Sequence, residues 1–276
     1  MNANDLGSKA RENYERDGYL LHPESLFPTD LVDGAVAGVD AIRRGEYDTG
    51  RPPQPSPWNP GDDPNRLCKI EQPQFASQAI RNLLRHPALG RLAAELTGAT
   101  RVQAWWVQLL VKPSSPVDAP PVTNVGWHQD RYYWNIWEEG SELFTAWIAL
   151  SDVREECGAM RFVLRSHRWG LLPESDFFAQ DIAAQRSAMR VPMDAEWRET
   201  VAALPIGGVS FHDEYTLHAS GPNVSGEPRR SLAVHLRTER SKSVGDARKG
   251  LAEFIDNTDL CPILFDRQRS VTRTES

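Results

Sequence analysis

The segment RVQAWWVQLLV, residues 101–111, consists largely of β-branched, aromatic and other apolar side chains and predicts a long strand. Shorter segments of the same character follow it, and turn residues separate most of them: 143–150, 159–164, 207–212 and 231–237. Strands that alternate with turns, without regular helices between them, favour an antiparallel sandwich or barrel over a parallel α/β sheet. We therefore predict a mainly β core over about residues 101–240.

The first hundred residues have a different pattern, because most of their apolar residues recur at helical spacing. We expect helices over 8–17, from about Phe27 onward, and over 78–97, with Pro87 breaking the last of them. The segment 45–64 is too rich in proline and glycine for a helix, so it predicts a loop and a candidate lid over an active site.

Two segments outside the predicted strands complete the chain. The charged insertion 174–200 is expected to be helical, and the polar tail after Pro262 is expected to be poorly ordered. Residues 241–276 are predicted to be a C-terminal extension. A chain of 276 residues fits one large domain, so we predict a single domain over 1–276.

Composition narrows the class of protein. The net charge is −7, and no basic run favours nucleic-acid binding. No segment approaches the roughly 18–20 apolar residues that span a bilayer, and the N-terminus lacks the apolar core of a secretory signal. The three cysteines are scattered and form no disulfide framework, which is typical of reduced thiols. We therefore expect a cytoplasmic protein without a membrane or nucleic-acid partner.

The segment GWHQD, residues 126–130, offers two ligands to one metal ion. Residues two apart in an extended chain project to the same face, which places His128 and Asp130 on one side of an ion. Iron(II) in oxygenases is held by two imidazoles and one carboxylate, and its other positions stay open for co-substrate and dioxygen. Because an HxD pair is common by chance, the hypothesis needs a distant histidine on a neighbouring strand.

The segment 212–230 contains that histidine. His218 precedes a Gly-Pro-Asn turn, Ser220 follows two residues later, and Arg229 begins the next predicted strand. A hairpin brings Arg229 back beside His218. A cation there suits 2-oxoglutarate, which chelates iron through its 2-oxo acid end and leaves one carboxylate for a guanidinium and a hydroxyl to bind.

Neighbouring residues are alternatives for these positions. His212 and Asp213 compete with His218 as ligands, but only His218 has a serine and an arginine at matching offsets. Arg230 competes with Arg229, although strand alternation points it to the opposite face. We favour His218 and Arg229.

Taken together, the motifs resemble the phytanoyl-CoA dioxygenase family of iron(II)- and 2-oxoglutarate-dependent oxygenases. The resemblance extends over roughly residues 14–240, and an arginine stands eleven positions after the histidine of its second motif. The matching segments are YERDGYLL at 14–21, WHQD at 127–130, AWIAL at 146–150, CGAMRFV at 157–163 and HASGPN at 218–223.

The resemblance implies a double-stranded β-helix, which is a jelly roll of the cupin type, and an enzyme that uses iron(II), 2-oxoglutarate and dioxygen. It makes His128, Asp130 and His218 the iron ligands. It assigns the far carboxylate of 2-oxoglutarate to Arg229 and Ser220. Four further residues match family positions near the 2-oxoglutarate pocket or are placed to face it: Lys69, Gln108, Gln129 and Trp147.

The implied reaction decarboxylates 2-oxoglutarate to succinate and carbon dioxide and oxidises a carbon of the substrate. Family members that halogenate lack the carboxylate ligand. Asp130 therefore indicates hydroxylation, or a related desaturation or ring-forming oxidation.

The substrate is left open by the sequence. Tryptophans crowd residues 105–147 and, with Tyr132 and Tyr133, form either a packed core or an aromatic pocket for a small molecule, such as a natural-product intermediate. Arg131 and Arg161 either pair with an acidic substrate group or form surface salt bridges. A zinc hydrolase, which needs a carboxylate as general base, and a metal-stabilised binding module are the alternative functions.

Overall fold

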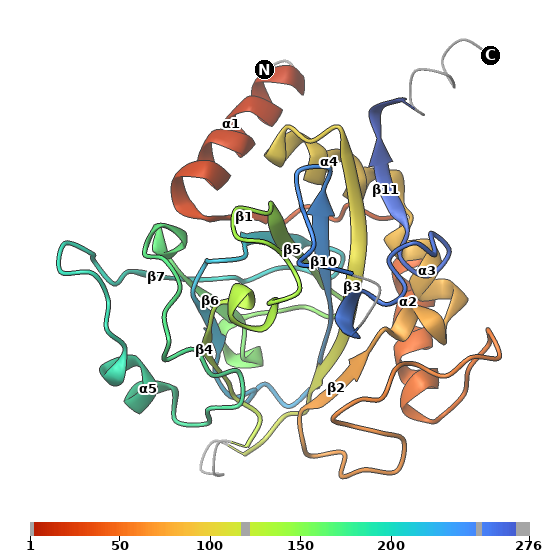
Figure 1. The fold of residues 1–276 in the computed structure, drawn as a ribbon. Helices are drawn as coiled ribbons and strands as arrows, with labels where there is room; N and C mark the ends of the chain where they lie inside the picture. Colours follow the sequence, from red (N-terminus) through yellow and green to blue (C-terminus); the bar gives the residue numbers. More distant parts are fainter. Residues whose placement is uncertain (1–2, 117–121, 247–249, 269–276) are drawn as a thin grey trace.

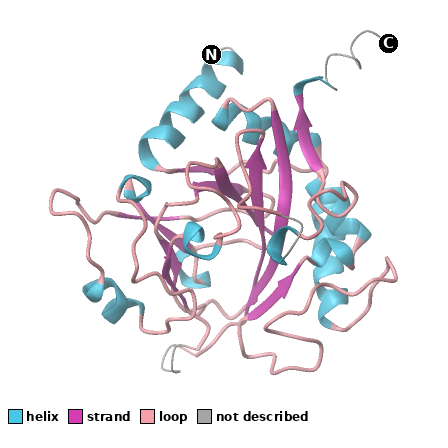
Figure 2. Ribbon diagram, viewed as in Figure 1, coloured by secondary structure: helices cyan, strands magenta, loops and turns pink. Residues whose placement is uncertain are grey.

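Two antiparallel sheets form the core of the computed structural model, which describes residues 3–116, 122–246 and 250–268 (Figures 1 and 2). The large sheet contains β1 (Tyr19–His22), β2 (Cys68–Glu71), β3 (Arg101–Lys112), β5 (Leu143–Ala149), β8 (Val209–Asp213), β10 (Arg229–Thr238) and β11 (Ile263–Asp266). The small sheet contains β4 (Val125–His128), β6 (Met160–Val163), β7 (Glu199–Val201) and β9 (His218–Ser220). The α-helices are α1 (Ala3–Asp17), α2 (Thr29–Arg43), α3 (Gln78–Leu84), α4 (Pro87–Thr97) and α5 (Ile182–Ala188).

The strand order confirms the predicted jelly roll. The large sheet runs β1-β8-β5-β10-β3-β11, with β2 also paired to β3, and the small sheet runs β4-β9-β6-β7. The chain therefore crosses repeatedly between the sheets from β3 to β10, which is the pattern of a jelly roll. All five strands predicted for the core are present within a few residues of their expected bounds.

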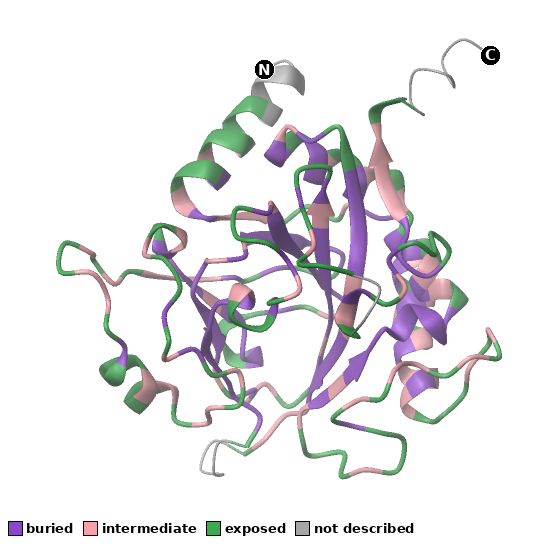
Figure 3. Cartoon of the chain, viewed as in Figure 1, coloured by how far each residue is buried: buried purple, intermediate pink, exposed green. Residues whose placement is uncertain are grey.

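Alternation along the strands gives the large sheet two different faces. On β3, Val107, Leu109 and Val111 pack in the main apolar core, which also contains residues of α2, α3 and α4. The alternate residues Gln108 and Leu110 line a cavity on the opposite face. Helices therefore cover one face of the sheet and leave the other to the small sheet and the site. Most residues of the central strands β3 and β10 are buried (Figure 3).

The N-terminal helices agree with their predicted positions. Pro87 separates α3 from α4, and α4 ends at Gly98, whose positive φ of 66° suits a glycine after a helix. α1 begins at Ala3 and so is longer than the predicted 8–17. β2 was not predicted.

Two expectations outside the core are corrected. The insertion 174–200 is mostly loop and contains only α5 and the start of β7. The tail after Pro262 forms β11, which pairs with β3, while residues 269–276 lie outside the described residues. Strands on both sides of 101–240 thus extend the large sheet; the single-domain organisation stays a prediction.

The proline-rich loop 45–64 does not act as the predicted lid. None of its residues lines the cavity among the described part of the chain. Trp58 is buried in the main core instead, and Gln54 forms an isolated bridge with Glu71. The loop therefore packs against β2 and the main core, away from the cavity.

Two further sequence expectations can be compared with the structure. No helix among the described residues is long and apolar enough to cross a membrane. Cys68, Cys157 and Cys261 are buried and free, as expected for scattered thiols.

Gly126 lets a loop approach the strand that leads to the HxD motif. Its amide donates to the carbonyl of Phe177, and the next amide, of Trp127, donates to the side chain of Gln185. A Cβ at position 126 would lie 2.2 Å from the Asp176 carbonyl oxygen and 2.7 Å from Ala179 Cβ. Glycine is therefore required for the loop 174–185 to pack along β4.

We predict that Gly126→Ala lowers the free energy of unfolding by about 1–3 kcal/mol, because the loop must shift away from β4. Chemical denaturation measures the change. Gly34→Ala in α2 is the matched control, since its Cβ would meet only Ala79 Cβ at an ordinary 3.7 Å. The control should raise stability by up to about 1 kcal/mol. Equal stability of Gly126→Ala and the wild type would contradict the close packing.

Candidate metal centre

The two histidines come from adjacent strands of the small sheet. His128 ends β4, His218 begins β9, and the two residues are direct partners in the antiparallel register. Their ring centroids lie 4.1 Å apart. Asp130 opens the short 3₁₀ helix η2 (Asp130–Tyr133), and its Oδ1 lies 3.8 Å from His128 Nε2 and 3.9 Å from His218 Nε2. All three residues are buried, and their candidate ligand atoms lie within 4.8 Å of one another.

Backbone carbonyls hold both imidazoles in the orientation that a metal needs. Nδ1 of His128 contacts the Gly126 carbonyl at 2.8 Å, and Nδ1 of His218 contacts the Thr216 carbonyl at 2.9 Å. Each Nδ1 must therefore carry the proton, which leaves the lone pair on Nε2. Burial lowers the pKa of His128, and burial with the neighbouring histidines lowers that of His218 well below its usual value. Both rings are thus neutral and fit for metal binding.

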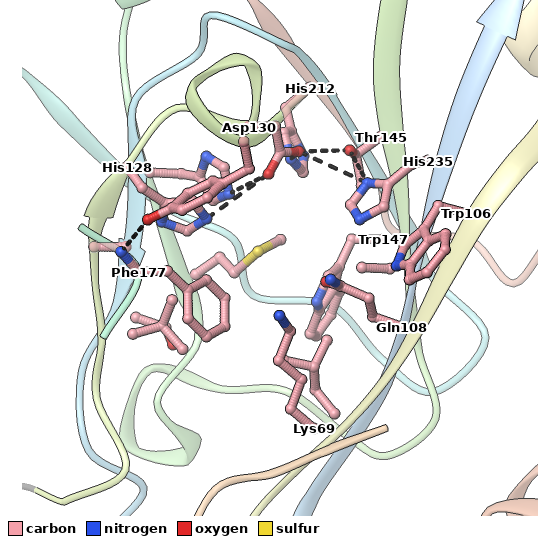
Figure 4. A pocket seen from close by; sticks show the side chains of 18 of the residues that line it. Lys69, Trp106, Gln108, His128, Asp130, Thr145, Trp147, Phe177, His212 and His235 are labelled. Atoms are coloured by element: carbon pink, nitrogen blue, oxygen red, sulfur yellow. Dashed lines mark hydrogen bonds and ion pairs between the residues drawn. The ribbon is translucent and has the colours of Figure 1, made fainter. Parts of the chain in front are cut away.

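The large sheet fixes the carboxylate of Asp130. Its Oδ2 accepts a hydrogen bond of 2.6 Å from the Thr145 hydroxyl on β5 and one of 3.2 Å from His212 Nε2 on β8 (Figure 4). Burial alone would raise the pKa of Asp130, but the His212 hydrogen bond and nearby histidines hold it well below its usual value. Oδ1 is left to face the two Nε2 atoms.

This geometry separates the ligand candidates from their neighbours. His212, the sequence alternative to His218, contacts Asp130 Oδ2 and not the open side of the cluster. His235 contacts the Thr145 hydroxyl through Nδ1, 2.8 Å away, and burial lowers its pKa to about 4. Two imidazoles and one carboxylate oxygen converge on one side, which fits iron(II). The sequence did not indicate the roles of Thr145 and His235, which depend on strand pairing.

A cavity of about 320 Å³ opens beside the cluster. Its walls come from the inner faces of both sheets and from loops, and six of the lining residues are Trp, Tyr or Phe. Predicted site residues that line it are Lys69, Gln108, His128, Asp130, Trp147, His218, Ser220 and Arg229.

Arg229 and Ser220 line the same cavity, as predicted. Arg229 is buried, its guanidinium carbon lies 5.3 Å from the Trp147 ring centroid, and burial lowers its pKa to about 10. Its Nη1 donates to the Gly158 carbonyl, while its Nε has no partner among the described residues. Arg230 points to the other face and pairs with Asp40 at 3.1 Å. The strand alternation expected from the sequence is therefore present.

Lys69 and Gln108 also face the cavity, and both contact Glu71. The Lys69 ammonium lies 3.0 Å from Glu71 Oε1, and Gln108 Nε2 donates to the same oxygen at 3.4 Å. Trp106 Nε1 donates to Glu71 Oε2 at 2.6 Å. Lys69 is thus already paired, unlike the Nε of Arg229.

Gln129 lies outside the cavity, so the expectation that it faces the co-substrate is corrected. Its Nε2 donates to the carbonyls of Gly170 and Tyr215, and its Oε1 accepts from the Leu172 amide at 2.7 Å. Between two residues that face the cavity, strand alternation turns Gln129 the other way. Its side chain therefore connects the loops around residues 170–172 and 215 by hydrogen bonds, outside the cavity.

The tryptophans divide between core and cavity. Trp106, Trp134 and Trp147 line the cavity. Trp105 and Trp137 do not line it, and they pack with Trp134 in a buried apolar cluster. Of the tyrosines after the HxD motif, Tyr133 faces the cavity and accepts a 2.8 Å hydrogen bond from the Phe177 amide.

Phe177 and Phe178 were missed by the sequence prediction, because they lie in an insertion that looked only charged. Both line the cavity, and the Phe177 ring lies 5.1 Å from the ring of His128. Arg131 pairs with Glu214, and Arg161 with Glu155 and Glu199, so neither faces the cavity.

Comparison with known proteins identifies the family. The family model of phytanoyl-CoA dioxygenase (PhyH) matches residues 14–231. The chain belongs to the phytanoyl-CoA dioxygenase family. Ectoine dioxygenase of Bordetella parapertussis is 26% identical over 243 residues, which cover 83% of this chain and 75% of that protein. This dioxygenase family uses iron, 2-oxoglutarate and dioxygen, and the present member is accordingly an oxidoreductase.

Solved structures show the same fold. The epimerase SnoN, in complex with Fe³⁺, alpha-ketoglutarate and nogalamycin RO, matches with a TM-score of 0.66 and 23% identity over 88% of this chain and 87% of SnoN. The carbocyclase SnoK from nogalamycin biosynthesis matches with a TM-score of 0.64 and 23% identity over 88% of each chain. At this identity the likeness concerns the jelly roll alone.

Thr145→Val should weaken metal binding by roughly ten- to a hundredfold, because Asp130 loses a hydrogen bond that orients its carboxylate. Competition with a chelator of known affinity measures the change. Thr200→Val is the matched control, since Thr200 contacts Tyr19 and does not line the cavity. Unchanged affinity in Thr145→Val would show that Asp130 needs no such support.

Proposed function

We propose that the protein hydroxylates a carbon atom of a small molecule, with iron(II) at His128, Asp130 and His218 and with 2-oxoglutarate bound toward Arg229. One observation carries the proposal. A single cavity is lined both by three buried metal-ligating side chains and by a buried arginine whose Nε has no partner among the described residues. A metal chelate with one free carboxylate satisfies both needs.

Each side chain has a defined task in this proposal. Nε2 of His128 and His218 and Oδ1 of Asp130 hold the ion from one side. Bound iron(II) supplies dioxygen activation at the positions that these residues leave open. Arg229 binds the distal carboxylate of 2-oxoglutarate, and the Trp147 ring restricts its guanidinium.

The overall reaction balances without another reductant. One atom of dioxygen enters a substrate C–H bond as a hydroxyl, and the other enters succinate. The carboxylate next to the 2-oxo group leaves as carbon dioxide. Asp130 supports hydroxylation over halogenation, because it fills the position that a halide takes in halogenating relatives.

The contacts of Glu71 argue against the alternative of a zinc hydrolase. Such an enzyme needs a carboxylate free to act as general base near the metal-bound water. Besides Asp130, the described carboxylate that lines the cavity is Glu71, and its oxygens accept from Lys69, Gln108 and Trp106. A hydrolase would also leave Arg229 without a task.

We further propose an apolar or aromatic substrate, such as a natural-product intermediate, for a cytoplasmic enzyme. Trp106, Trp134, Tyr133, Phe177 and Phe178 supply aromatic surface to the cavity. The fold shared with SnoN and SnoK adds a fold-level analogy. The buried free cysteines support a reducing compartment.

The test is a spectroscopic titration without oxygen, followed by a succinate assay in air. Iron(II) and 2-oxoglutarate together should give the weak band in the green part of the spectrum that this chelate produces. His128→Ala should abolish the band and succinate formation. Arg229→Ala should need roughly ten- to a hundredfold more 2-oxoglutarate, because a charge-assisted hydrogen-bond pair is lost.

His22→Ala is the control for loss of a histidine, since His22 lies on β1 and does not line the cavity. It should retain both the band and succinate formation. Tight, colourless zinc binding with no band in the wild type, or full activity of His128→Ala, would refute the proposal.

A further inference from the structure

Lys112, the last residue of β3, is a second buried cation beside Arg229. The two residues are direct partners in the β3–β10 register, and the side chain of Lys112 is completely buried. Burial and, after it, the charge of Arg229 lower the pKa of Lys112 well below its usual value. Like charges opposite each other in a sheet are unfavourable, and burial increases the cost.

No carboxylate offsets these two charges within the described part of the chain. The Lys112 ammonium donates to Ser220 Oγ at 2.7 Å, to the Ser220 carbonyl at 3.2 Å and to the Gly221 carbonyl at 2.5 Å, all of which are neutral. Arg229 donates to the carbonyl of Gly158 and leaves Nε without a partner. The pair therefore lacks an anion.

The packing around Lys112 keeps this arrangement in place. A Cβ on Gly158 would lie 3.0 Å from Lys112 Cδ and 2.6 Å from the Gly221 carbonyl oxygen. The absence of a side chain at Gly158 thus makes room for the lysine stem, and its carbonyl receives Arg229. Asn223 closes the end of β3 by donating to the Lys112 carbonyl at 3.0 Å.

Ser220 connects the buried lysine to the cavity. Lys112 does not line the cavity, whereas Ser220 and Arg229 do. Three oxygen atoms surround Lys112 Nζ, which matches the three protons of an ammonium. Ser220 Oγ then accepts from the ammonium, and the hydroxyl proton stays available for another acceptor. The proton can then point toward an anion that Arg229 holds.

We propose that Lys112 is a positioning residue for the distal carboxylate of the 2-oxo acid co-substrate: it orients the Ser220 hydroxyl and adds a second positive charge behind Arg229. This inference rests on the proposed function. It explains the unbalanced pair of cations, and it makes the site select dicarboxylic over monocarboxylic 2-oxo acids.

The test compares two ligands on the nickel(II)-loaded protein, which binds without turnover. Calorimetry measures the affinity for 2-oxoglutarate and for pyruvate, a 2-oxo acid without the distal carboxylate. Lys112→Met keeps the apolar stem of the side chain and removes its charge. It should weaken the affinity for 2-oxoglutarate by at least about tenfold and leave the affinity for pyruvate unchanged. Arg230→Met is the control, since it removes a positive charge next to Arg229 on β10 but on the opposite face of the sheet; it should change neither affinity.

A second variant keeps the inference testable if Lys112→Met fails to fold. Ser220→Ala should show the same selective loss of affinity for 2-oxoglutarate. The double variant should lose no more of this affinity than the more affected single variant, because Lys112 and Ser220 act through the hydrogen bond that joins them. Equal weakening of both ligands, or unchanged 2-oxoglutarate affinity in either single variant, would overturn the inference. If the wild type binds no 2-oxoglutarate with nickel, the proposed function itself fails.

Discussion

The carboxylate of Asp130 joins the two sheets of the jelly roll, and the candidate metal centre depends on that connection. Its Oδ1 faces the histidines of the small sheet, while its Oδ2 accepts from Thr145 and His212 on the large sheet. A buried carboxylate without such donors would be costly, so the sheets must keep their relative position for it to stay ionised. The fold thus sets the spacing of the ligand atoms.

The distribution of charge in the cavity follows from the same constraint. The anion of Asp130 lies among neutral imidazoles, whereas Arg229 and Lys112 concentrate positive charge where β3 meets β10. A bound metal cation would offset the negative charge of Asp130, and a bound carboxylate would offset the positive charges of Arg229 and Lys112. Glu71 and Lys69, in contrast, form an ion pair on β2, and much of the remaining wall is apolar.

The sequence predicted those parts of the fold and site that depend on local pattern. Runs of β-branched, aromatic and other apolar residues between turns placed the core strands, and the spacing of His128, Asp130, His218 and Arg229 placed the candidate ligands on shared faces. It could not predict Thr145, His212 and Lys112 as supporting residues, because their contacts arise only when distant strands pair. Gln129 and the loop 45–64 were misplaced for a related reason: strand direction and loop packing decide which side faces the cavity.

The most direct test is a crystal structure of the protein with iron(II) and 2-oxoglutarate, grown without oxygen and measured at the iron absorption edge. We predict one anomalous peak bonded to His128 Nε2, Asp130 Oδ1 and His218 Nε2, with the distal carboxylate at Arg229 and Ser220. A metal held by His212 or His235, or a distal carboxylate bound at Lys69, would contradict the proposed centre.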